Sequence, residues 1–300
     1  MILITGASGN LGKATVHALL KKGVKPTSLS VLVRDETKVS ELKLQGVTVK
    51  IGDYDNYESL VEAFKGVDKL FFVSGSDVFN RVKQHENVVK AAKQAGVPYI
   101  VYTSFASNDE TETSAIAMVA ISHLKTEDLI KESGISYTIL KNAIYMDMLP
   151  MFMGEQVLQT GVIAQPAGNG KSAYASRNDI AEAAANILTS NGHEEETYTL
   201  AGERSYSYGD IAGILSEITG NEIKYISLTA EEFGKMLKEA HVPDEYIGLF
   251  TAFSVAKSKN EFNTPGTTLA KLLGRKPTTM EDFLKSVYNK QPSNSLETVN

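Results

Sequence analysis

Three glycines near the start of the chain have the spacing of a backbone site for phosphate. Gly6, Gly9 and Gly12 lie in the segment ITGASGNLG, which follows the apolar run 1–4 and precedes the helix-type stretch 13–22. Glycine lets a chain turn tightly and approach a ligand without a Cβ atom in the way. A helix that begins at such a loop offers free N–H groups and a partial positive charge to an anion. The order of strand, glycine loop and helix therefore predicts a site for the pyrophosphate of a dinucleotide.

Two other interpretations of this loop have weaker support. A strand-to-helix turn that binds no ligand is the simpler alternative, but the loop has the strand before it and the helix after it that the binding motif requires. A P-loop needs a glycine five residues before Gly12, where Ala7 stands, and a hydroxyl side chain after Lys13, where Ala14 stands. We therefore reject the P-loop.

The end of the next apolar run predicts which dinucleotide is bound. Arg34 ends the run 29–33, at the place where an Asp or Glu would bind the ribose 2′-hydroxyl of NAD. A guanidinium there favours the 2′-phosphate of NADP, and Lys38 adds a second cation close behind. Asp35 is acidic and adjacent, so NAD stays open as the second choice. We expect NADP, used as NADPH, to be the cofactor.

Polar and small residues after later strands complete the expected cofactor site, because ligands of open parallel sheets bind at the carboxyl ends of the strands. Asp53 follows the strand-type run 47–51 and is placed to bind an adenine amino group, whereas Asp55 suits the N-cap of a helix at 57–64. The expected cofactor-binding residues are Thr5, Gly6, Ser8, Gly9, Asn10, Leu11, Gly12, Arg34, Lys38, Asp53, Ser74, Gly75, Ser76 and Thr103.

The order of predicted elements indicates the α/β class. Strands are expected at 1–4, 29–33, 47–51, 67–73, 99–103, 135–140 and 196–200. Helices are expected at 13–22, 57–64, 81–95, 123–132, 177–188, 207–219, 230–240, 268–274 and 280–288. Their alternation predicts a Rossmann-type, doubly wound parallel sheet.

After Pro150 the alternation of strands and helices changes, which predicts a smaller C-terminal α/β lobe that faces the substrate. The glycine-rich segment 161–170 is predicted to form a hairpin. We expect a dinucleotide-binding domain at 1–150, completed by 173–201, a substrate lobe at 151–290, and a mobile, apolar-poor tail at 291–300.

Composition narrows the possible functions. A chain of 300 residues with 42% hydrophobic and 22% charged residues is ordinary for a soluble globular protein. The net charge of −6 argues against a nucleic-acid partner, and the lack of cysteine excludes disulfides and thiolate chemistry. The five histidines form no His-x-x-x-His pair, so no metal is expected. Without an apolar stretch of bilayer length or a charged leader, we expect a cytoplasmic protein with no membrane partner.

Several segments together resemble the NmrA-like family of atypical short-chain dehydrogenases/reductases, with most likeness to triphenylmethane reductases and type 2 NADPH:quinone oxidoreductases. These segments are TGASGNLG at 5–12, VRD at 33–35, GDY at 52–54, FVSG at 72–75, the helical run 87–97, HLKTE at 123–127 and YTILKNAIY at 137–145. The resemblance extends over residues 1–288. It implies an NADP-binding Rossmann domain, a smaller C-terminal lobe and a substrate cleft between them.

The activity that the resemblance implies is hydride transfer from NADPH to quinones or to dye-like acceptors, azo or triphenylmethane. The expected partner is therefore a small aromatic or quinone substrate, and the expected assembly is a monomer or a homodimer. The family also contains members that bind the cofactor without known turnover. A redox-sensing regulator that signals through a protein partner is thus the alternative function.

The tyrosine and lysine of ordinary short-chain dehydrogenases are matched in spacing by Tyr137 and Lys141. On a helix the two side chains would lie about 6 Å apart on one face. The β-branched run 135–140 predicts a strand, on which four residues span about 13 Å. We therefore expect no catalytic tyrosine–lysine pair. Hydride transfer to an electrophilic acceptor needs little acid–base help, because the nicotinamide carries the chemistry.

The candidate substrate residues come after the fifth and sixth predicted strands. The resemblance places Asn142 and Tyr145 at the cleft, and we take them as candidate catalytic residues. Phe105, Tyr145 and Met148 are the candidate substrate contacts, and His123 and Lys125 are alternative hydrogen-bond donors. The methionines between 146 and 153 suit either a flat apolar ligand or ordinary packing between lobes.

Replacing Arg34 tests the choice of cofactor. Arg34→Ala is expected to weaken NADPH binding about tenfold or more, because a charged hydrogen bond to phosphate contributes about 1.5–3 kcal/mol. NADH binding is expected to change much less. Fluorescence titration of both cofactors measures the difference, and an equal loss for the two would show that Arg34 does not recognise the 2′-phosphate.

Overall fold

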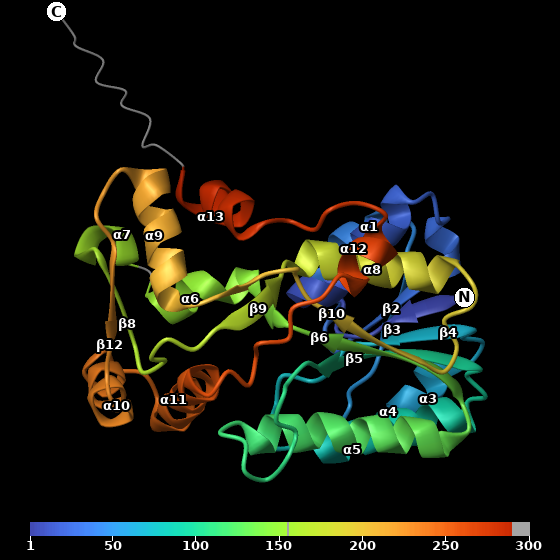
Figure 1. The fold of residues 1–300 in the computed structure, drawn as a ribbon. Coiled ribbons are helices and arrows are strands. Elements are labelled where there is room, and N and C mark those ends of the chain that lie inside the picture. Colours follow the sequence, from blue (N-terminus) through green and yellow to red (C-terminus); the bar gives the residue numbers. More distant parts are fainter. Residues whose placement is uncertain (155, 290–300) are drawn as a thin grey trace, which may run out of the picture.

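The computed structural model describes residues 1–154 and 156–289, and a seven-stranded sheet lies at its centre (Figure 1). The strands follow the order β10-β6-β5-β4-β1-β2-β3, and all neighbours are parallel. They are β1 (Ile2–Ile4), β2 (Leu29–Val33), β3 (Thr48–Ile51), β4 (Lys69–Phe72), β5 (Tyr99–Phe105), β6 (Ser136–Asn142) and β10 (Glu196–Leu200). The predicted doubly wound parallel sheet is confirmed, and its order reverses at β1.

Helices cover both faces of the sheet, because consecutive strand residues point to opposite sides. Ile4 and Phe71 belong to the core on one face, and Leu3 and Phe72 to the core on the other. The first face carries α1 (Asn10–Lys21), α8 (Arg177–Thr189) and α12 (Thr268–Leu273), and the second carries α3 (Tyr57–Phe64), α4 (Arg81–Gln94) and α5 (Ala117–Ser133) (Figure 1). The short helix α2 (Ser40–Leu44) also contributes to the first core.

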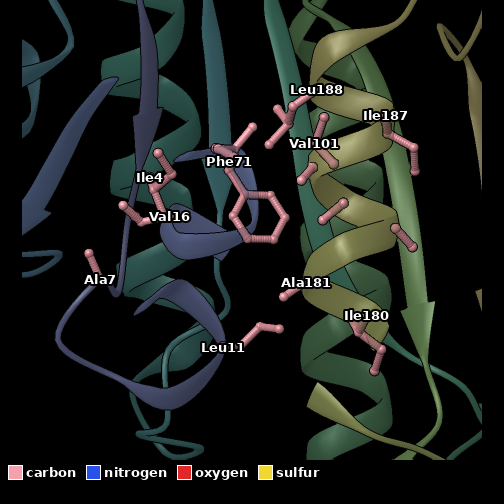
Figure 2. Close-up of a cluster of buried hydrophobic side chains, with 14 of the residues drawn as sticks. Ile4, Ala7, Leu11, Val16, Phe71, Val101, Ile180, Ala181, Ile187 and Leu188 are labelled. Atoms are coloured by element: carbon pink, nitrogen blue, oxygen red, sulfur yellow. The ribbon is translucent and has the colours of Figure 1, made fainter. Parts of the chain in front are cut away.

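The first core brings together segments that are far apart in the chain. Figure 2 shows the Phe71 ring between the glycine-loop region and helix α8, with Leu11 and Ala181 close to each other below it. Fully buried alanines on α8, such as Ala184, let this helix approach α1 closely. The glycine loop near the start of the chain therefore packs against a helix from the second half of the chain.

The remaining elements form a second lobe with its own apolar core. Its strands are β7 (Ile144–Tyr145), β9 (Ser172–Ala175) and β11 (Ser205–Tyr206) in one small sheet, and β8 (Val162–Gln165) and β12 (Lys224–Ser227) in another. Its helices are α6 (Leu149–Met153), α7 (Val157–Thr160), α9 (Tyr208–Thr219), α10 (Ala230–Glu239), α11 (Asp244–Ser258) and α13 (Met280–Tyr288). None of the described helices is long and apolar enough to cross a bilayer.

The predicted hairpin at 161–170 is wrong. Strand β8 pairs in parallel with β12, and β9 belongs to the other small sheet. Residues 167–170 do form a turn, in which the Gly170 N–H group donates to the Ala167 carbonyl oxygen at 3.0 Å, but the strands on its two sides do not pair with each other. Gly170 also permits a close approach of two backbones, because a Cβ atom there would lie 1.9 Å from the carbonyl oxygen of Lys257 on α11.

Four further predictions need correction or stay untested, and one helix was not predicted. Helix α5 begins at Ala117, six residues before the predicted start at 123, and α11 was not predicted. Asn56, rather than Asp55, caps α3 by accepting a hydrogen bond from the Ser59 N–H group. The division of the chain near residue 150 stays a prediction, and the predicted tail at 291–300 lies outside the described residues.

Phe71 provides a test of the core that joins the two halves of the chain. Phe71→Ala is expected to lower the free energy of unfolding by about 3–5 kcal/mol, because the ring is fully buried and its loss leaves a cavity. Phe79→Ala is the matched control, since that ring is 69% exposed and its loss is expected to cost less than about 0.5 kcal/mol. Urea denaturation of both variants measures the difference, and similar losses would contradict the assignment of this core.

Candidate active site

A cavity of about 620 Å³ lies at the carboxyl ends of the central strands and extends into the second lobe. Crevices at this edge of a doubly wound sheet are where ligands bind. The predicted site residues that line the cavity are Gly6, Ser8, Gly9, Asn10, Leu11, Gly12, Arg34, Asp53, Ser74, Gly75, Ser76, Phe105, Tyr145 and Met148. Phe152, Arg177 and Phe253 also line it, so both halves of the chain contribute to the cavity wall.

The glycine loop turns the backbone directly from β1 into α1. Gly6 has φ +59°, a left-handed conformation, and the Gly9 N–H group donates to its carbonyl oxygen at 2.9 Å. A Cβ atom on Gly12 would lie 2.4 Å from that same oxygen, so only glycine fits. Helix α1 starts at Asn10 with no acidic residue in its first turn and no side-chain cap. Its first N–H groups therefore face the cavity as a site for an anion.

Three predicted cofactor residues do not line the cavity. Thr5 is fully buried, and its Oγ1 atom accepts hydrogen bonds from the Tyr54 hydroxyl at 2.6 Å and the Val73 N–H group at 2.9 Å. Thr103 is also fully buried and accepts a hydrogen bond from the Ser74 N–H group at 2.9 Å. Both threonines hold the loop after β4 from behind. Lys38 is exposed and lies outside the cavity wall.

The structure separates the two charged residues after β2. Arg34 lines the cavity, whereas Asp35 does not. The Asp35 carboxylate accepts hydrogen bonds from the Thr37 N–H group at 3.0 Å and the Thr37 hydroxyl at 2.7 Å, and these bonds lower its pKa. Asp35 therefore serves the local turn, and the guanidinium is the group presented to a ligand at this strand end.

At the other end of the cavity Tyr145 is held between two polar side chains. Asn142 is 1% exposed, does not line the cavity, and donates through Nδ2 to the Tyr145 hydroxyl at 3.2 Å. The guanidinium of Arg177 lies 4.4 Å from the centre of the Tyr145 ring. Burial raises the pKa of Tyr145, so its hydroxyl keeps its proton and is able to donate it in a hydrogen bond. Asn142 thus acts on a ligand only through Tyr145.

Aromatic side chains form the rest of this end. Phe105 and Phe253 line the cavity with ring centres 6.3 Å apart in an edge-to-face arrangement, and Phe152 and Met148 lie on the same wall. Phe253 belongs to α11, which the sequence analysis missed. The apolar residues of α11 are spread around the helix rather than along one side, so no periodic signal marks it.

A buried polar cluster behind this wall was also missed. His85 on α4 accepts a hydrogen bond from the Gly75 N–H group at Nε2, 2.9 Å away, and its Nδ1 atom lies 2.8 Å from the Thr126 hydroxyl. An N–H group can only donate, so this imidazole is neutral with its proton on Nδ1. Burial lowers the pKa of His85 to about 3. Arg81 is four residues earlier, and this i, i+4 spacing is a signal that both side chains share one helix face.

Of the other residues considered as acid–base groups or donors, His123 lines the cavity, and Tyr137, Lys141 and Lys125 do not. Tyr137 and Lys141 both lie on strand β6, as predicted, and the Lys141 ammonium is 2.7 Å from the Glu110 carboxylate. Lys125 is exposed on α5 and does not line the cavity, whereas His123 does. Across the described ranges, no three His, Asp or Glu side chains gather in a group that could hold a metal ion.

The family model described as "NmrA-like family" matches residues 1–284. The chain belongs to this family. It is 36% identical to quinone oxidoreductase 2 of Escherichia coli over 289 residues, which cover 96% of this chain and 99% of that protein. It is 27% identical to the NAD(P)H azoreductase of Xenophilus azovorans, covering 95% and 97% of the two chains. The crystal structure of the Citrobacter sp. triphenylmethane reductase complexed with NADP(H) superposes with a TM-score of 0.88 at 38% identity, covering 95% of this chain and 99% of that one.

Gly12 provides a test of the loop as a dinucleotide site. Gly12→Ala is expected to weaken NADPH binding at least about tenfold, because the new methyl group must push the Gly6 carbonyl away and shift the first turn of α1. Gly213→Ala on α9 is the matched control, since a Cβ atom there meets nothing within 4 Å. Isothermal titration calorimetry on both variants measures the effect, and unchanged affinity in Gly12→Ala would contradict the assignment.

Proposed function

We propose that this chain is an NADPH-dependent oxidoreductase that transfers a hydride to quinones or to dye-like acceptors of the azo or triphenylmethane type. The observation that carries the proposal is a single cavity that joins a phosphate-type loop and Arg34 to an aromatic wall with Tyr145. The names of the relatives, a quinone oxidoreductase, an azoreductase and a triphenylmethane reductase, support the same chemistry. They do not favour a non-catalytic redox-sensing regulator.

The residues at the loop end fit a bound NADPH. The first N–H groups of α1 would hold its pyrophosphate, and Arg34 would hold its 2′-phosphate. Ser74, Gly75 and Ser76 line the middle of the same cavity, where small side chains leave room for a ribose. When bound, the reduced nicotinamide supplies the hydride.

The residues at the aromatic end would hold a flat acceptor against that hydride. Phe105, Met148 and Phe253 would bind a ring by apolar contact and keep water out. The Tyr145 hydroxyl would donate a hydrogen bond to the acceptor, with Asn142 holding it in place. We propose that residues 1–150 supply the cofactor site, and that residues 151–290 face the substrate through Phe152, Arg177 and Phe253.

A panel of acceptors tests the proposal. Purified protein is mixed with NADPH or NADH and with menadione, methyl red or malachite green, and oxidation of the cofactor is followed by absorbance. We expect turnover with at least one acceptor and a higher kcat/KM with NADPH than with NADH. Tight NADPH binding without oxidation in the presence of any acceptor class would refute the proposal.

A further inference from the structure

Arg81 is a buried cation next to the cavity with only neutral partners. It is 6% exposed and lines the cavity, and its Nε and Nη1 atoms donate to the Gly75 carbonyl oxygen at 3.0 Å and the Ser122 hydroxyl at 3.1 Å. It forms no ion pair within residues 1–154 and 156–289. Asp77 attracts it from a greater distance, but that carboxylate is exposed and accepts from the Phe79 and Asn80 N–H groups. Buried charges are normally paired, so a negative group in the cavity would complete this site.

His123, the residue after Ser122, presents a hydrogen-bond donor to the same cavity. Its Nδ1 atom lies 2.7 Å from the Tyr102 hydroxyl, and its ring stacks on Phe105 with centres 6.1 Å apart. The other histidine near Tyr102 is His85, which carries its proton on Nδ1 and cannot accept there. Tyr102 therefore donates to His123, and the His123 proton is on Nε2, on the side of the ring left for the cavity.

Three carboxylates line the cavity, and none of them forms an ion pair with Arg81 within the described residues. Asp53 and Asp55 follow β3, the edge strand, whereas His123 lies beside β5, on the opposite side of β1. Asp77 is the third, and its exposed carboxylate accepts hydrogen bonds from the backbone N–H groups of Phe79 and Asn80. The second guanidinium at the acceptor end, Arg177, has Asp147 at 3.9 Å. The acceptor end is therefore a positive site with a neutral donor beside it.

We propose that the Arg81 guanidinium and the His123 Nε2–H group stabilise the negative oxygen that forms when a quinone accepts a hydride, so that this site favours neutral quinones over cationic dyes. The inference rests on the proposed function and assigns its substrate preference to two residues. Tyr102 is a positioning residue, because it acts on the substrate only through His123.

The charge balance of the two reactions explains the preference. A neutral quinone that accepts a hydride from the reduced nicotinamide gains two electrons and one proton, and becomes a quinol monoanion. A proton from water then completes the quinol. A cationic triphenylmethane dye that accepts the same hydride at its central carbon becomes a neutral leuco compound. Preorganised donors stabilise the charge that develops in the first reaction, whereas in the second the cation of the substrate is repelled by Arg81.

The buried cluster suits His123 to donate a hydrogen bond rather than a proton. Burial and the nearby Arg81 charge hold the pKa of His123 well below its usual value. Burial also raises the pKa of Tyr102, so that hydroxyl does not replace a proton lost from the imidazole. The final proton therefore comes from bulk water at the cavity mouth, after the hydride has been transferred.

Two variants and two acceptors test the inference. Arg81→Met removes the charge while keeping an unbranched side chain, and His123→Phe keeps the ring but removes the donor. Each is expected to lower kcat/KM for menadione about 100-fold, at the lower end of the loss seen when a donor to a developing oxyanion is removed. For malachite green the value is expected to stay the same or to rise in Arg81→Met. Arg81→Lys and His123→Gln, which keep the charge and a donor, are expected to recover part of the menadione activity.

The outcomes separate this inference from the proposed function. Wild-type protein that reduces no acceptor would refute the proposed function and this inference with it. Wild-type turnover with an equal loss for both acceptors in the two variants would overturn only the inference. The same holds if Arg81→Met weakens NADPH binding enough to account for its whole loss, since Arg81 would then serve the cofactor. Thermal unfolding and NADPH titration of each variant identify misfolding. If Arg81→Met or His123→Phe is misfolded, the menadione and malachite green activities of Arg81→Lys and His123→Gln decide whether the inference holds.

Discussion

The close contact between the first turn of α1 and the carbonyl oxygen of Gly6 is the constraint on which the cavity depends. Because Gly12 has no Cβ atom, helix α1 can begin within a few residues of β1 and stay close to the sheet. Strand β1 is also the point where the strand order reverses, so the connections to its two sides diverge and leave a crevice there. The N-terminus of α1 and the crevice therefore meet at the same edge of the sheet. An anion that binds to the helix N-terminus lies inside the crevice.

The second half of the chain closes this crevice from two directions. Helix α8 packs against α1 through small residues, and the Phe71 ring fills the space between α8 and the strands (Figure 2). The same helix begins at Arg177, which lies over the Tyr145 ring. Helix α11 adds Phe253 on the far side. The apolar end of the cavity thus consists of side chains that are brought together by packing between distant segments rather than by one local motif.

Behind the cavity, a set of buried polar groups keeps the loop after β4 in place. His85 binds the Gly75 N–H group, and Arg81 binds the Gly75 carbonyl oxygen, so both polar atoms of one residue are held from α4. In a low-dielectric interior such bonds are strong, and an unpaired member is costly. The loop is therefore rigid on the side away from a ligand. Arg81 forms no ion pair within the described residues, and its guanidinium presents this positive charge to the cavity.

Local sequence signals determined the strands and helices of the Rossmann layer and named most residues that line the glycine-loop end of the cavity, because strand, glycine loop and helix cap are short-range patterns. The hairpin predicted at 161–170 is wrong, because a local turn signal does not determine whether the strands on its two sides pair with each other. Helix α11 was missed because its apolar residues are spread around the helix and show no period. Thr5 and Thr103 had the right sequence positions, but their hydroxyls bond to the backbone behind the cavity. Phe105, Tyr145, Met148 and His123 were candidates from the sequence. That Arg81, Arg177 and Phe253 join them at the acceptor end was decided only by the tertiary structure, because these residues come from elements that touch only after the sheet and both lobes have packed.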